Sequence, residues 1–177
     1  MSSHIDDFCE LRNSVWCEVT QFLDAMPDSA KRLSGQFRER IGRRTALYGD
    51  FEGAFSSAGV CRILYLPFWT MSAYSQDKSS DSRLESLGVE LAVSACLGFF
   101  AVRIQDDLVD EDVAGADVVE LVLANLCMLE SVRRLHRLFS SDSPFWTYYH
   151  RSWKDYSDAV MWERERNLKG LYRYAED

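Results

Sequence analysis

Apolar residues recur at three- and four-residue spacing through most of the chain, and this spacing restricts the fold more than any other feature. Nine glycines and three prolines among 177 residues leave few points where a helix must break, and no Asn-Gly or Asp-Gly turn marks a hairpin. Hydrophobic residues make up 47% of the chain, which is enough to fill the core of one domain. We therefore expect a single all-α domain over residues 1–177, built as an antiparallel helical bundle.

Prolines and short polar stretches divide the chain into expected helices. Pro27 should end the first helix, and the SSDSP turn should begin the last one. Between them, the polar loop QDKSSDS precedes the longest apolar pattern in the chain. The expected helices span about residues 6–26, 28–48, 61–74, 82–110, 118–139 and 144–167.

The charge and cysteine content exclude several classes of protein. A net charge of −8 argues against nucleic-acid binding, although the basic stretch Lys31–Arg44 is either a solvated helix face or a contact for an anion. Five widely spaced cysteines without a CxxC pair favour reduced thiols in a cytoplasmic protein. The amino terminus lacks the pattern of a signal peptide. The longest near-apolar run, Leu91–Val102, is too short to be a transmembrane segment.

An acidic cluster, QDDLVDED, stands where the long apolar helix is expected to end. A carboxylate at the negative end of a helix costs roughly 0.3–1 kcal/mol, before the carboxylates repel one another. Asp106 and Asp110 are four residues apart and share a face, with Asp107 one step round. This face continues the stripe of Leu87 and Leu91, so we expect these carboxylates to point into the bundle.

Carboxylates held close together in a bundle repel one another, so we expect a cation to bind between them. With no His or Cys near Asp106, Asp107 and Asp110, oxygen ligands favour Mg²⁺, which prefers to share its coordination sphere with phosphate oxygens. A solvated acidic helix end is the alternative interpretation. Upstream, Gly98 and Ala101 are small, which either leaves room for a long apolar ligand or permits close helix packing.

In this setting, DDLVD within FFAVRIQDDLVDED resembles the DDxxD motif of trans-prenyltransferases and class I terpene synthases. The resemblance implies the first half of the class I isoprenoid synthase fold and Mg²⁺-dependent ionisation of an allylic prenyl diphosphate. By position, Asp106, Asp107 and Asp110 would be its metal-binding and catalytic residues. Whether such an enzyme would be a terpene cyclase or a prenyltransferase stays open.

The resemblance also implies an apolar substrate pocket. Residues one or two turns before the first aspartate would set its depth, here Gly98, Ala101 and Val102. An aromatic surface protects a carbocation, and packing in the core is the alternative role of those rings. Glu163 would reach the metal-diphosphate cluster or pair with Arg166. The candidate aromatic residues are Tyr149, Trp153 and Tyr156.

The second metal site of such enzymes is not complete in this sequence. Asp155 and Glu163 have the outer spacing of a metal-binding triad, but Ala159 stands where a hydroxyl ligand belongs. We therefore expect a truncated enzyme missing its carboxy-terminal half, a half-size protein that completes its cavity as a homodimer, or an inactive relative that binds prenyl diphosphate. From another class, a noncatalytic helical interaction module with an acidic patch is the alternative.

Overall fold

The computed structural model describes residues 3–44, 66–67, 70, 82–109 and 119–168. Over these residues the chain is helical and contains no strand, which confirms the all-α class predicted from the apolar spacing. Most of the predicted aromatic segment 61–74 lies outside the described residues. The helices are α1 (Ser3–Asp24), α2 (Asp28–Arg44), α5 (Ser82–Val109), α6 (Glu120–Leu138) and α7 (Pro144–Leu168).

The helix boundaries follow the breaks in the sequence. Pro27 lies between α1 and α2, and Asp28 places a carboxylate in the first turn of α2, where the helix dipole is positive. Pro144 is the first residue of α7, a position at which its missing N–H removes no helical hydrogen bond. Ser143 Oγ accepts a hydrogen bond from the backbone N–H of Phe145 at 3.3 Å and so caps α7. Both predicted breaks are confirmed.

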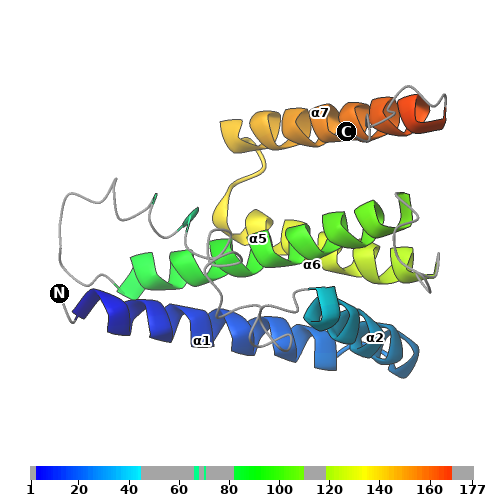
Figure 1. The fold of residues 1–177 in the computed structure, drawn as a ribbon. Coiled ribbons are helices and arrows are strands. Elements are labelled where there is room, and N and C mark those ends of the chain that lie inside the picture. The colour runs from blue at the N-terminus through cyan, green and yellow to red at the C-terminus, as the bar shows by residue number, and fades with distance from the viewer. Residues whose placement is uncertain (1–2, 45–65, 68–69, 71–81, 110–118, 169–177) are drawn as a thin grey trace, which may run out of the picture.

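The helices lie in layers, with α5 and α6 as an antiparallel pair in the middle (Figure 1). Helices α1 and α2 lie on one side of this pair, and α7 lies on the other side. Helix α1 runs in the same direction as its neighbour α5. The expected antiparallel arrangement therefore holds for α5 and α6 but not for α1 and α5.

The core lies between the α5–α6 pair and the first two helices. Leu23, Leu97 and Leu123 are among its largest fully buried side chains, one each from α1, α5 and α6. Helix α7 adds no residue to this cluster. The remaining members are Val15, Val19, Met26, Ala30, Leu33, Ala92, Val93, Cys96, Phe100, Ala101, Ile104, Ala124 and Cys127.

Two serines join α5 to α6 inside the bundle. Ser94 Oγ and Ser131 Oγ are 2.9 Å apart, and each hydroxyl also lies within 3.0 Å of the other residue's carbonyl oxygen. Because both side chains are buried, these contacts satisfy polar groups that would otherwise have lost their hydrogen bonds to water. The pair fixes the register of α5 against α6.

A buried arginine joins three helices. Arg134 of α6 is 5% exposed, and its guanidinium donates to Glu130 on the same helix at 2.9 Å. It also donates to Glu90 of α5 at 3.1 Å and to Glu18 of α1 at 2.8 Å. We call these four residues the Arg134 cluster. All three donating nitrogens of the guanidinium are used, so the arginine enters the bundle without an unpaired nitrogen.

The Arg134 cluster makes stability depend on pH. Burial by itself would raise the pKa of Glu130, but hydrogen bonds from Arg133 and Arg134 outweigh it and hold the pKa below the ordinary value of 4.5. A carboxyl with a lowered pKa stabilises the folded state above its unfolded pKa and loses this contribution as the pH falls through its folded pKa. We expect the free energy of unfolding to fall below pH 4.5.

Urea unfolding of the wild type and of Glu130→Gln at several pH values checks this expectation. The difference in stability between the two proteins should be constant from pH 6 to 7 and should shrink as the pH drops below 4.5. A difference that stays constant down to pH 3 would contradict the assigned role of Glu130.

Two cysteines behave as core residues. Cys96 and Cys127 are buried, and burial raises the pKa of each thiol to about 12, so both stay protonated at neutral pH. Cys17 is an exposed free thiol on α1. The expectation of reduced, buried thiols is therefore confirmed for two of these three cysteines.

Candidate functional site

Helix α5 carries apolar residues on two opposite faces. Its core face contains Val93, Leu97 and Ile104, all fully buried. Half a turn around the helix, a second apolar face is only half-buried. We call it the second face of α5. Its residues are Leu87, Leu91, Ala95, Gly98 and Val102.

This two-sided composition also gives α5 the properties of a possible membrane span. By length and composition, Ser86–Val109 is the one stretch within the described residues that is apolar enough to cross a membrane. Half of its apolar window is buried inside the bundle, and core helices of soluble proteins pass the same test.

The neighbouring aspartates at the end of α5 belong to different faces. Asp107 follows the core face, and its side chain is 2% exposed. Asp106 follows the second face, and its side chain is 45% exposed. We had expected the stripe through Leu91 and Asp106 to be the innermost one, but the stripe through Leu97 and Asp107 is buried more deeply. Asp110 lies outside the described residues.

One arginine bridges the two aspartates. Arg103 Nη1 lies 2.6 Å from Asp106 Oδ2, and Arg103 Nη2 lies 3.1 Å from Asp107 Oδ1. The spacings of three and four residues on a helix allow one guanidinium to reach both carboxylates. Both carboxylates lie near the carboxyl end of α5, where the helix dipole is negative, and Arg103 places a positive charge beside them.

Sequence reasoning missed Arg103. Arg103 stands three positions before Asp106 and four positions before Asp107, and side chains at these spacings meet on a helix surface. This spacing could have predicted the contact.

The predicted aromatic residues do share one face of α7. Tyr149, Trp153 and Tyr156 are half-buried, while Tyr148 on the adjoining face is exposed. The rings meet edge to face, with centroids 6.3 Å apart for Tyr149 and Trp153 and 5.4 Å apart for Trp153 and Tyr156. This aromatic face is continued by Val160.

Two aromatic side chains near the start of α7 contact α6. Tyr149 Oη donates to Met128 Sδ at 3.8 Å, and burial raises the pKa of this phenol, so it stays neutral. Trp146 stacks on His136 with ring centroids 3.9 Å apart and donates from Nε1 to the carbonyl oxygen of Ser140 at 2.9 Å. These contacts hold the beginning of the aromatic face of α7 against α6.

The three pocket residues predicted on α5 differ in burial: Ala101 is in the core, whereas Gly98 and Val102 are half-buried. Ala101 is fully buried in the core, so it packs between helices. A Cβ atom added at Gly98 would lie 3.5 Å from Ser131 Oγ, which is ordinary contact with α6. Close helix packing thus accounts for Ala101, whereas the space at Gly98 would admit a Cβ atom. Val102 lies on the second face and is half-buried.

The candidate ligands on α7 lie in solvent. Glu163 is exposed, and so is Asp155, whose carboxylate is 3.9 Å from Arg151 on the same helix. Within the described part of the chain, no three His, Cys, Asp or Glu side chains are arranged to hold a metal ion. Asp106 and Asp107 are adjacent in the sequence, but their side chains are 45% and 2% exposed and both contact Arg103.

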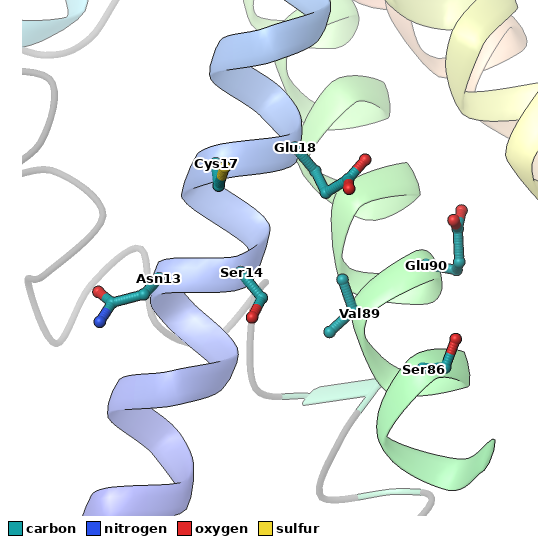
Figure 2. A pocket seen from close by; sticks show the side chains of 7 residues that line it. All are labelled: Asn13, Ser14, Cys17, Glu18, Ser86, Val89 and Glu90. Carbon is teal, nitrogen blue, oxygen red and sulfur yellow. The ribbon is translucent and has the colours of Figure 1, made fainter. Parts of the chain in front are cut away.

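A separate groove of about 550 Å³ lies between α1 and α5 (Figure 2). Glu18 and Glu90 of the Arg134 cluster reach it from the two helices. Glu90 and Asp106 are separated by about 24 Å along the axis of α5, so this groove is not part of the aspartate site. Its other lining residues are Asn13, Ser14, Cys17, Ser86 and Val89.

Comparison of the chain with protein-family models, with curated proteins and with solved structures found no match.

Proposed function

We propose that this chain is a Mg²⁺-dependent class I isoprenoid synthase, or a truncated or half-size relative of one, which binds an allylic prenyl diphosphate in the cytoplasm. The observation that supports the proposal best is the second face of α5. A half-buried apolar strip leads along this helix to Asp106. A ligand with an apolar chain and an anionic head has the matching chemistry.

Asp106 and Asp107 would hold the metal, together with Asp110 by its place in the motif. Mg²⁺ would neutralise the diphosphate and stabilise the charge that develops on it as the allylic bond breaks. Asp106 would hold the cation at the end of the strip, and Arg103 joins it to Asp107 on the core face through contacts of 2.6 and 3.1 Å. A guanidinium displaced by the metal would be free to contact a phosphate oxygen.

The apolar chain would lie along Leu91, Ala95 and Val102. Opposite them, Tyr149, Trp153 and Tyr156 would exclude water and place ring faces near the carbocation. These roles give the half-buried aromatic face of α7 a use beyond packing. The chain would provide one wall of the active site, and the second metal site would come from a carboxy-terminal half or from another subunit.

Replacing Asp106 with alanine should weaken Mg²⁺-dependent binding of farnesyl diphosphate at least about tenfold, because a metal ligand is lost. Titration calorimetry with geranyl, farnesyl and geranylgeranyl diphosphate, each with and without Mg²⁺, measures this effect. Asp158→Ala is the matched control, since Asp158 is also a half-exposed helical aspartate paired with a basic residue, Lys154.

Two results would contradict the proposal. One is equal binding with and without Mg²⁺, and the other is equal binding by the wild type and Asp106→Ala. Product analysis after incubation with Mg²⁺ then separates an active enzyme from a relative that only binds the diphosphate.

A noncatalytic helical interaction module is the second candidate function. Large apolar side chains are exposed on α6 and α7, among them Leu129, Tyr148 and Met161. Such surfaces commonly mark contacts with other proteins. Calorimetry with Mg²⁺ and pyrophosphate alone separates the candidates, because a protein-binding module has no reason to bind the two together.

A further inference from the structure

The guanidinium of Arg103 lies between the two aspartates near the end of α5. Its Nη1 atom is 2.6 Å from Asp106 Oδ2 and its Nη2 atom is 3.1 Å from Asp107 Oδ1, so each nitrogen contacts a different carboxylate. Around the helix axis, position 103 stands between positions 106 and 107, which explains why one side chain reaches both. A positive charge of the chain itself therefore already lies against these two oxygens.

A metal ion shared by the two carboxylates would need the same oxygens. Mg²⁺ binds oxygen ligands at about 2.1 Å, which is closer than either contact of Arg103. The metal ion and the guanidinium carry charges of the same sign, so they repel each other at this distance. Binding of the metal ion therefore requires Arg103 to move away from at least one aspartate.

The two contacts of Arg103 differ in their exposure to water. The side chain of Asp107 is 2% exposed, whereas those of Asp106 and Arg103 are 45% and 37% exposed. Water and salt screen the contact with Asp106 more than the contact with Asp107. A metal ion would thus reach Asp106 from solvent while Arg103 still holds Asp107.

Arg103 has an advantage over a metal ion from solution because it belongs to the same helix. The side chain is attached one turn before both aspartates, so pairing with them costs no translational freedom, whereas the capture of a free ion does. The negative end of the α5 dipole favours either cation. Free Mg²⁺ therefore has to replace a partner that is always nearby.

We propose that Arg103 is an internal competitor of the metal ion, and that its guanidinium weakens the binding of free Mg²⁺ to Asp106 and Asp107. The inference rests on the proposed function, since it concerns regulation of the same site. Mg²⁺ that arrives with a diphosphate is favoured over the free ion, because the displaced guanidinium then has phosphate oxygens to contact. The site would take up the metal together with the substrate and would exclude the metal alone.

Titration calorimetry with Mg²⁺ alone tests the competition. Arg103→Met should bind Mg²⁺ at least about fivefold more tightly than the wild type, because the competing charge is gone and both carboxylates remain. Loss of a residue that only maintains the shape of the helix end would not raise this affinity. Arg133→Met is the matched control, since Arg133 is also half-exposed and lies 2.6 Å from the carboxylate of Glu130, three residues away. Its replacement should leave Mg²⁺ binding unchanged.

The same titrations in the presence of pyrophosphate test the link to the diphosphate. After correction for the complex that Mg²⁺ and pyrophosphate form without protein, the advantage of Arg103→Met should disappear, because methionine cannot contact a phosphate oxygen. Pyrophosphate should therefore raise the affinity for Mg²⁺ more in the wild type than in Arg103→Met. By linkage, Mg²⁺ should raise the affinity for pyrophosphate by the same factor in each protein.

Arg103→Lys provides a second comparison, which decides the matter if circular dichroism shows that Arg103→Met does not fold. Lysine keeps the positive charge, but its single ammonium group does not reproduce the two separated nitrogens of the guanidinium. Its affinity for Mg²⁺ alone should be higher than that of the wild type and lower than that of Arg103→Met.

The possible failures of the inference and of the proposed function give different results. If the folded Arg103 variants bind Mg²⁺ alone no more tightly than the wild type, and the wild type binds Mg²⁺ and pyrophosphate together, the competition is overturned and the proposed function stands. If neither the wild type nor the Arg103 variants bind Mg²⁺ and pyrophosphate together, the proposed function fails and the inference fails with it.

Discussion

Arg134→Met should destabilise the folded chain by about 3 kcal/mol, because Glu18, Glu90 and Glu130 all lose the same partner. Methionine fills a similar volume but donates no hydrogen bond. The cost stays below that of a fully buried pair because Glu18 and Glu90 can reach water: their side chains are 41% and 25% exposed. Urea unfolding followed by circular dichroism at pH 7 measures the change.

Arg137→Met is the matched control for this prediction. Arg137 is also on α6, but its side chain is 50% exposed and its guanidinium lies 3.7 Å from Glu90. Its replacement should cost less than about 1 kcal/mol. Equal losses for the two variants would mean that the Arg134 cluster does not hold the three helices together.

Leu97→Ala should cost about 3 kcal/mol, since Leu97 is fully buried on the core face of α5 and its truncation leaves a cavity. Leu91→Ala, two turns away on the second face, removes the same atoms from a half-buried position. We expect its cost to be below about 1.5 kcal/mol, because water can reach part of the vacated space. Urea unfolding of both variants makes the comparison.

The same pair of variants has a second use in binding measurements. If the second face of α5 holds a prenyl chain, Leu91→Ala should weaken the binding of farnesyl diphosphate more than that of pyrophosphate. A larger loss of stability for Leu91→Ala than for Leu97→Ala would show that the two faces of α5 have been assigned the wrong way round.

The helix boundaries could be predicted because local residues determine them. Pro27 cannot continue α1, and Pro144 with the Ser143 hydroxyl begins α7, whatever the rest of the chain does. The long helix carrying Asp106 was likewise recognisable from its apolar spacing. These features depend on neighbours within a few positions in the sequence.

The orientation of α5 could not be predicted from its own sequence. Leu91, Ala95 and Val102 form a second apolar stripe beside the one formed by Val93, Leu97 and Ile104, and periodicity alone does not show which stripe is buried. Contacts with α1 and α6 decide which stripe is buried. For the same reason, the deeper burial of Asp107 than of Asp106 became apparent only in the structure.

The polar contacts inside the bundle have a consequence for the uniqueness of the fold. Because both faces of α5 are apolar, burial of the second face in place of the core face would also give a hydrophobic gain. Only one rotation lets Ser94 reach Ser131 and brings Glu90 to Arg134. The few hydrogen bonds at these two points thus favour the observed rotation of α5 over one that would bury its second face.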